Sequence, residues 1–114
     1  MSVETLTVMS LTSVAINVAL LAGALSALLI ETVVGEGGYL VPTKRWLQMV
    51  RQLCDRHGIL LILDEVQSGM GRTGKMWAFE HFGVAPDIMT VAKGVGSGMP
   101  VAAVVADKAI MDTW

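Results

Sequence analysis

Two short apolar runs, each leading into a residue that can do chemistry, constrain this chain more than any other feature. The run Ile59–Leu63 leads into Asp64, and the run Ile88–Ala92 leads into Lys93. The first run is apolar on both faces, as the strands of a buried parallel sheet are. Active sites in such sheets lie at the carboxyl ends of the strands. We therefore expect the Asp64 carboxylate and the Lys93 amine to face one pocket.

The remaining pattern predicts an α/β layered sheet, because strands alternate with a helix. Pro42 suits the start of a helix, and Gly58 suits its C-terminal cap. Glycines at 35, 37 and 38 predict a loop in which the backbone approaches a neighbour closely. The expected elements are helices over 5–23 and Thr43–His57, and strands over Ala27–Thr32, Ile59–Leu63, Ile88–Ala92 and Val101–Ala106.

Length and charge exclude several classes of protein. The 114 residues correspond to one modest domain. A net charge of −2 leaves no basic surface for nucleic acid. The single cysteine, Cys54, excludes an intramolecular disulfide and fits a reducing, cytoplasmic location. Its place in a helical pattern predicts a buried, inert thiol.

The N-terminal stretch allows a second location. No charged residue lies between Thr5 and Ile30, which is long enough for a helix to span a bilayer. Polar residues within the stretch, and the absence of Lys or Arg before Lys44, disfavour that interpretation. We expect residues 1–24 to form an apolar helix, with membrane association through residues 5–24 as the alternative.

Other site types fit the sequence poorly. Residues 69–75 nearly match a phosphate-binding loop, but Met76 stands where a hydroxyl should ligate Mg²⁺. The same glycines match a dinucleotide fingerprint, but they begin five residues after Asp64, whereas in a dinucleotide fold they belong in the tight strand-to-helix turn, followed by an acidic residue about twenty positions on. His57 and His81 are far apart, and neither has ligand spacing with Cys54. No metal site is expected.

An amine and a carboxylate facing one pocket suit pyridoxal phosphate, since the amine forms a Schiff base and the carboxylate keeps the ring nitrogen protonated. The string LLILDEVQSGMGRTGKMWAFEHFGVAPDIMTVAKGVGSGMP, residues 60–100, closely resembles the signature of class-III pyridoxal-phosphate aminotransferases, which have fold type I. The resemblance extends back through 35–39 and 53–58 and covers residues 25–112. It implies that residues 25–114 are part of the mainly parallel-sheet large domain of such an enzyme.

The resemblance also implies roles in holding the cofactor. Lys93 matches the lysine that carries the internal aldimine and then transfers protons. Asp64 matches the aspartate that pairs with the pyridine nitrogen. Val66 matches a residue that packs on the ring, and Gln67 matches one that hydrogen-bonds near its phenolic oxygen. Arg72, in the matching turn, is expected to be mainly structural.

Further roles concern the substrate. Glu36 matches a glutamate that, in some members, pairs with an arginine from the C-terminal region and gates the amine donor against the 2-oxo acid acceptor. Glu31 matches an acidic residue that supports the site. The implied reaction is transamination by a homodimer. Thr32 and Val34 stand where the family usually has proline and glutamine.

Much of the family pattern has no match in this chain, including the upstream phosphate loop, the aromatic that stacks on the ring and the C-terminal domain. We therefore expect a partial chain of a transaminase. The alternative is a non-catalytic fragment or a membrane-associated interaction module.

Overall fold

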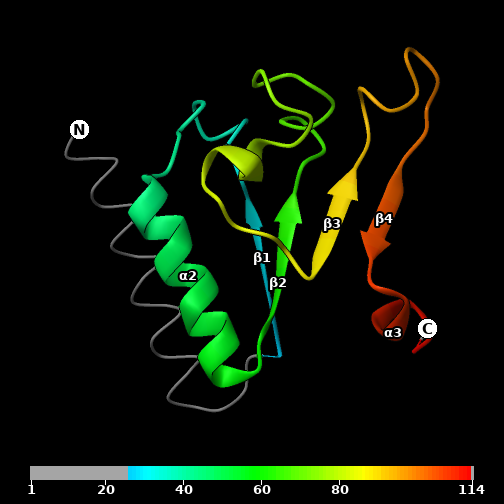
Figure 1. The fold of residues 1–114 in the computed structure, drawn as a ribbon. Helices are drawn as coiled ribbons and strands as arrows, with labels where there is room; N and C mark the ends of the chain where they lie inside the picture. The colour runs from blue at the N-terminus through cyan, green and yellow to red at the C-terminus, as the bar shows by residue number, and fades with distance from the viewer. Residues whose placement is uncertain (1–25, 114) are drawn as a thin grey trace.

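Four strands form one sheet in the computed structural model, which describes residues 26–113 (Figure 1). They are β1 (Ala27–Glu31), β2 (Leu60–Asp64), β3 (Ile88–Val91) and β4 (Ala103–Ala106), in the order β1-β2-β3-β4. The first three run parallel and β4 is antiparallel to β3. The predicted α/β fold with a mainly parallel sheet is confirmed. The helix expected over 5–23 lies outside the described residues.

Helix α2 (Lys44–His57) ends where its sequence predicts and begins one residue later than the predicted Thr43, which is its N-cap. The Thr43 hydroxyl accepts a hydrogen bond from the Trp46 N–H at 3.2 Å, which satisfies one of the unpaired N–H groups of the first turn. Gly58 has a left-handed backbone with φ of 64° and donates to the Cys54 carbonyl, which closes the helix. The expected cap at Gly58 is therefore confirmed.

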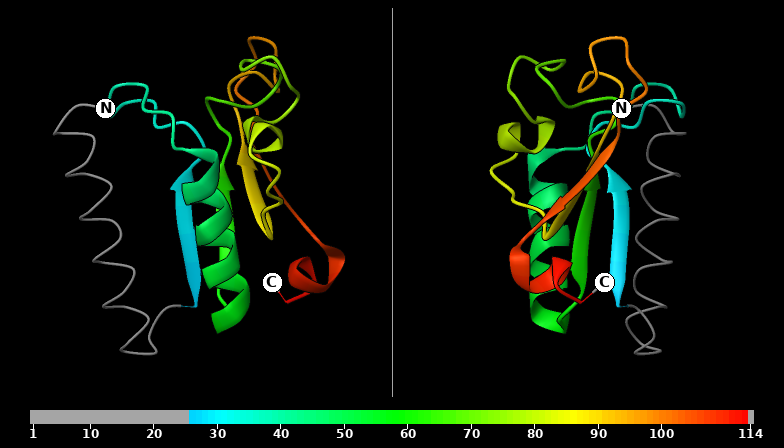
Figure 2. Two further views of the ribbon diagram at one scale, coloured as in Figure 1. Left: turned by 60° about the vertical axis from the view of Figure 1, so that its left-hand side comes forward. Right: turned by 90° about the vertical axis from the view of Figure 1, so that its right-hand side faces the viewer.

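The core lies between α2 and the sheet. Helix α2 and the short 3₁₀ helix η1 (Ala78–His81) lie on the same side of the sheet in Figure 2. A second short helix, α3 (Lys108–Met111), follows β4; neither η1 nor α3 was predicted. Burial of apolar side chains from both layers supplies the main stabilising free energy. The buried cluster contains Leu47, Val50, Cys54, Ile59, Leu61, Leu63, Phe82 and Val84.

Asp87, just before β3, joins three segments of the chain. Its Oδ2 accepts hydrogen bonds from the Leu61 N–H at 2.7 Å and from the Arg51 guanidinium at 2.8 Å. Burial by itself lowers the pKa of Arg51, but the hydrogen bonds and charges of Asp87 and Asp55 together outweigh burial and raise that pKa above its ordinary value. The pair ties α2 to the start of β3.

Cys54 is buried in the core, as predicted. Burial raises the pKa of its thiol, so the folded chain keeps the proton at pH values where the unfolded chain releases it. The resulting stabilisation is present below the ordinary thiol pKa and is lost as the pH rises from that value toward the raised one. We expect a disulfide reagent to modify the folded chain at least ~10-fold more slowly than the chain unfolded in urea, measured by thiol titration. Equal rates would contradict this burial.

The loops that follow β1, β2 and β3 gather at one end of the sheet (Figure 1), because these parallel strands all end there. The strands are offset slightly from prediction. Ile59 belongs to the turn after α2, where its N–H donates to the Cys54 carbonyl, and β2 runs on to include Asp64. The last strand begins at Ala103, because a turn in which the Val101 N–H donates to the Met99 carbonyl delays it.

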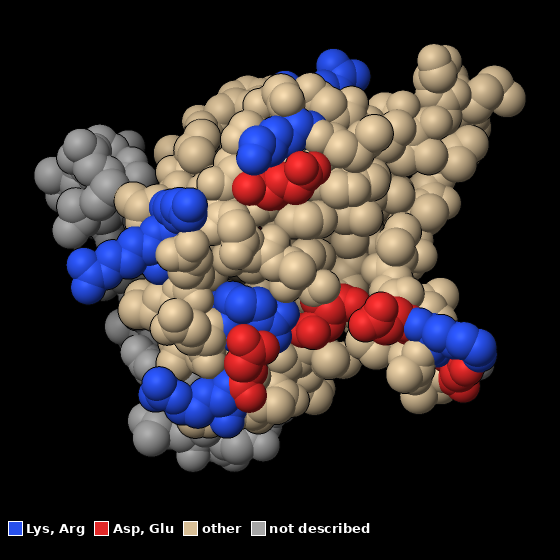
Figure 3. Space-filling view, viewed as in Figure 1, with Lys and Arg blue, Asp and Glu red and all other residues tan. Residues whose placement is uncertain are grey.

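The charged residues form no patch of a single sign on the face shown in Figure 3, where Lys and Arg alternate with Asp and Glu. In residues 26–113 there is no helix with both the length and the apolar character needed to cross a membrane.

Candidate active site

Acidic side chains from neighbouring strands lie side by side where the sheet ends. In the strand register Glu31 is the partner of Asp64, and Asp64 is the partner of Thr90. Side chains at paired positions of parallel strands project to the same face of the sheet. Lys93 follows three residues after Thr90, in the loop between β3 and β4. Strand register therefore places Lys93 near both carboxylates.

One pocket of about 150 Å³ at this end of the sheet contains all six of the predicted site residues. Its lining consists of Glu31, Val33, Glu36, Asp64, Val66, Gln67 and Lys93. Val33 is the member that sequence reasoning missed, because nothing in its apolar neighbourhood distinguishes it from a core residue. Three chain segments that are distant in sequence thus contribute to one pocket.

Asp64 is held in place by its own loop. Its Oδ1 accepts a hydrogen bond from the Val66 N–H at 2.9 Å, a local turn in which an aspartate satisfies the backbone two residues on. The carboxyl group is half-buried at the end of β2. A carboxylate oriented in this way is suited to accept a hydrogen bond from a protonated ring nitrogen.

Lys93 has an unusual backbone for a non-glycine residue. Its φ is +43°, in the left-handed region that side chains with a Cβ adopt rarely. Backbone strain of this kind is found most often at functional sites, where the surrounding structure maintains it. The amine donates a hydrogen bond to the Gln67 Oε1 at 3.1 Å, and the side chain is otherwise exposed to solvent.

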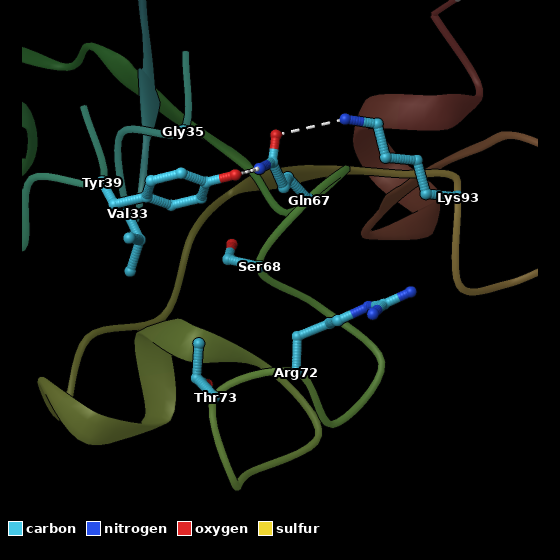
Figure 4. Close-up of a pocket in the computed structure, with 8 residues that line it drawn as sticks. All are labelled: Val33, Gly35, Tyr39, Gln67, Ser68, Arg72, Thr73 and Lys93. Atoms are coloured by element: carbon cyan, nitrogen blue, oxygen red, sulfur yellow. Dashed lines mark hydrogen bonds between the residues drawn. The ribbon is translucent and has the colours of Figure 1, made fainter. Parts of the chain in front are cut away.

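Gln67 lies between two partners, as Figure 4 shows. Its Oε1 accepts from Lys93, and its Nε2 donates to the Tyr39 hydroxyl at 3.2 Å. The backbone of Gly35 passes directly beside this amide: a Cβ added at Gly35 would lie 2.6 Å from Oε1. The glycine predicted to permit close approach therefore does so here, and a larger residue would force the Gln67 amide to move.

The loop after β1 is anchored by the Glu31 carboxylate. Its Oε2 accepts a hydrogen bond from the Gly35 N–H at 2.7 Å, so Glu31 holds the glycine beside Gln67. Glu36 lines the same pocket from an exposed position. Thr32, where the resembling family usually has proline, is buried, and its hydroxyl has no hydrogen-bond partner within residues 26–113.

A second, larger pocket of about 440 Å³ adjoins the first, since both are lined by Val33, Gln67 and Lys93. The other residues lining it are Gly35, Tyr39, Ser68, Arg72 and Thr73. Arg72, which was expected to be mainly structural, is one of these lining residues. In the same loop, the His81 Nε2 forms a hydrogen bond with the Thr73 carbonyl at 3.0 Å.

Glu65 is a supporting residue that sequence reasoning missed. Its side chain is only 1% exposed. Its carboxyl oxygens accept from the Ser68 hydroxyl at 2.8 Å and from the N–H groups of Ala78 and Phe79 at 3.0 and 3.1 Å. These bonds close the loop that carries Gln67 and Arg72. Strand alternation was the available signal, because it directs Glu65 to the opposite side from Asp64.

Comparison with known proteins gives a consistent result. A sequence model of the family described as Aminotransferase class-III matches residues 4–114. The chain is 60% identical over 81 residues to acetylornithine aminotransferase of Agrobacterium fabrum, a match covering 71% of this chain and 20% of that protein. It is 52% identical over 92 residues to leucine/methionine racemase of Thermococcus litoralis, covering 81% and 21% respectively.

Solved structures show the same relationship. The N-acetylornithine aminotransferase from Stenotrophomonas maltophilia superposes with a TM-score of 0.81 at 42% identity, covering 88% of this chain and 28% of that one. The chain spans about a fifth of the length of the curated relatives that it matches. The likeness therefore concerns only a part of those longer proteins.

Proposed function

We propose that this chain, which belongs to the class-III aminotransferase family, forms the part of a transaminase that attaches pyridoxal phosphate and orients its ring. Enzymes of this family depend on pyridoxal phosphate. The observation that carries the proposal is the single pocket lined by Lys93, Asp64 and Gln67. We further propose that residues 25–114 belong to the large cofactor-binding domain, and that residues 1–24 form a separate apolar helix.

The residues of the pocket fit this cofactor by their chemistry. Lys93 offers a nucleophilic amine, Asp64 a carboxylate for a protonated ring nitrogen, and Gln67 an amide that hydrogen-bonds an oxygen. Gly35 leaves space at the wall, because any larger residue there would meet the Gln67 amide. The adjoining larger pocket leaves room for a substrate beside the amine.

When bound, pyridoxal phosphate acts as an electron sink for negative charge that develops on the substrate carbon next to the amino group. We assign to Lys93 the covalent attachment of the cofactor and the holding and moving of a proton at its Nζ. Asp64 keeps the ring nitrogen protonated through its negative charge. Val66 packs on the ring face, and Gln67 hydrogen-bonds near the phenolic oxygen.

The acidic residues of the loop after β1 receive supporting roles. Glu31 holds the loop through the Gly35 N–H. Glu36, exposed at the pocket, is proposed to gate donor against acceptor by pairing with an arginine from another part of the longer protein. The partners are an amino donor and a 2-oxo acid, and the working unit is a homodimer. A cytoplasmic location fits the single reduced Cys54.

Chemical trapping tests the proposal directly. Pyridoxal phosphate is added to the purified chain, borohydride reduces the bond to the amine, and peptide mass mapping locates the label. We expect the label on Lys93, because this amine alone among the lysines lines the pocket with Asp64 in residues 26–113. Lys44, Lys75 and Lys108 serve as internal controls for random labelling. Label spread evenly over the four lysines would overturn the proposal.

A further inference from the structure

We propose that Tyr39 is a positioning residue, which fixes the Gln67 amide so that its oxygen is held against the Lys93 amine. The hydrogen bonds among Tyr39, Gln67 and Lys93 are observed in the structure, whereas their consequence for cofactor binding rests on the proposed function. The three side chains form a chain of two hydrogen bonds, from Lys93 Nζ to Gln67 Oε1 and from Gln67 Nε2 to the Tyr39 hydroxyl (Figure 4).

The Gln67 amide needs a second anchor. A glutamine side chain has three rotatable bonds and loses considerable freedom when it is fixed. Lys93 holds only the oxygen end of the amide, through a long side chain that is exposed to solvent and has many rotamers. The backbone of Gly35 lies against the Gln67 amide and limits its movement on that side. The Tyr39 hydroxyl holds the nitrogen end, so the oxygen end remains directed toward Lys93.

The backbone holds Tyr39 in place for this contact. Its φ is +55°, a left-handed conformation that is unfavourable for an aromatic residue. The Tyr39 N–H donates to the Gly35 carbonyl at 3.1 Å. The N–H of Val34 donates to the Leu40 carbonyl, and the N–H of Leu40 donates to the Val34 carbonyl, both at 3.0 Å. This small closed loop fixes where the ring projects.

Packing in the core does not explain the conformation of Tyr39. The residue is 72% exposed, so its ring contributes little apolar burial. The polar tip of the ring, by contrast, has a partner in the candidate active site. A strained residue whose hydroxyl contacts a site residue is what a positioning role requires. Tyr39 therefore acts on Lys93 through Gln67.

The test replaces Tyr39 with phenylalanine, which removes only the hydroxyl. The first measurement uses the cofactor-free chain and follows the Gln67 side-chain NH₂ signal by NMR, identified by its loss in Gln67→Met. We expect faster exchange with water and larger-amplitude motion of this group in Tyr39→Phe. An unchanged Gln67 signal would overturn the proposal, and this result does not depend on whether the chain binds a cofactor.

The second measurement is the affinity for pyridoxal phosphate, followed by visible absorbance. Tyr39→Phe is expected to weaken binding about three- to tenfold, as loss of one neutral hydrogen bond does. Because Tyr39 acts through Gln67, adding Tyr39→Phe to Gln67→Met should weaken binding no further. Fully additive losses would show that Tyr39 acts independently and would overturn the proposal. Val41→Ala, an exposed change in the same loop, should leave the affinity unchanged.

If the unchanged chain did not bind pyridoxal phosphate, that result would count against the proposed function. The NMR measurement would then decide by itself whether Tyr39 positions the Gln67 amide.

Discussion

Replacing Lys93 with alanine is expected to abolish the visible absorbance that pyridoxal phosphate acquires on binding, and to weaken its retention at least ~100-fold, because the covalent attachment is lost. The side chain is exposed and, among residues 26–113, makes one hydrogen bond, to Gln67. The free energy of unfolding should therefore change by only about 0.5 kcal/mol. The loss is measured by titrating both proteins with pyridoxal phosphate and by urea unfolding of each.

Two further variants identify the cause of this loss. Lys75→Ala removes an exposed lysine whose amine lies 3.5 Å from the Glu80 carbonyl, and it should leave the absorbance unchanged. Lys93→Arg keeps a positive charge but lacks a nucleophilic amine at neutral pH, so it should fail like alanine. If Lys93→Ala kept the absorbance of the unchanged chain, another residue would hold the cofactor and the assignment of Lys93 would be wrong.

Replacing Glu65 with alanine is expected to lower the free energy of unfolding by about 3–5 kcal/mol, because three hydrogen-bond donors lose a buried acceptor together. The donors are the Ser68 hydroxyl and the N–H groups of Ala78 and Phe79. A loss of this size is a large fraction of the stability of a typical domain. Urea unfolding followed by circular dichroism measures it.

Glu36→Ala is the matched control, since it removes the same chemical group from an exposed position in a neighbouring loop. It should change the unfolding free energy by less than ~0.5 kcal/mol. Glu65→Gln keeps one acceptor oxygen and should lie between the two. A loss below ~1 kcal/mol for Glu65→Ala would mean that the loop reorganises around the missing carboxyl group without penalty.

The sequence was most informative where the physics is local. The cap at Gly58 was predictable because a left-handed glycine satisfies a helix end within a few residues. The strands were predictable to within about two residues, because a continuous apolar run defines a buried strand but not where its pairing starts. The shift of β2 by one residue came from Ile59, whose N–H bonds back to the helix end.

The site was predictable in its members but not in its contacts. Asp64 and Lys93 were identified because they follow apolar runs, and the family resemblance supplied Val66, Gln67, Glu31 and Glu36. The lining of the larger pocket by Arg72 was not foreseen, since a sequence does not show which side chains border a cavity. Glu65 was missed because an acidic residue beside Asp64 looks solvated until η1 covers it.

By itself, the sequence determined which chemical groups stand at the ends of the strands, since strand length, helix caps and side-chain alternation depend on neighbouring residues. Only the tertiary structure decided which groups meet. The strand order and register pair Glu31 with Asp64, and the folded loops bring Tyr39 to Gln67, 28 positions further along the chain. The left-handed backbone of Lys93 is also a feature that only the tertiary structure decided. Such contacts depend on packing and hydrogen bonding between distant segments, which no local pattern of residues encodes.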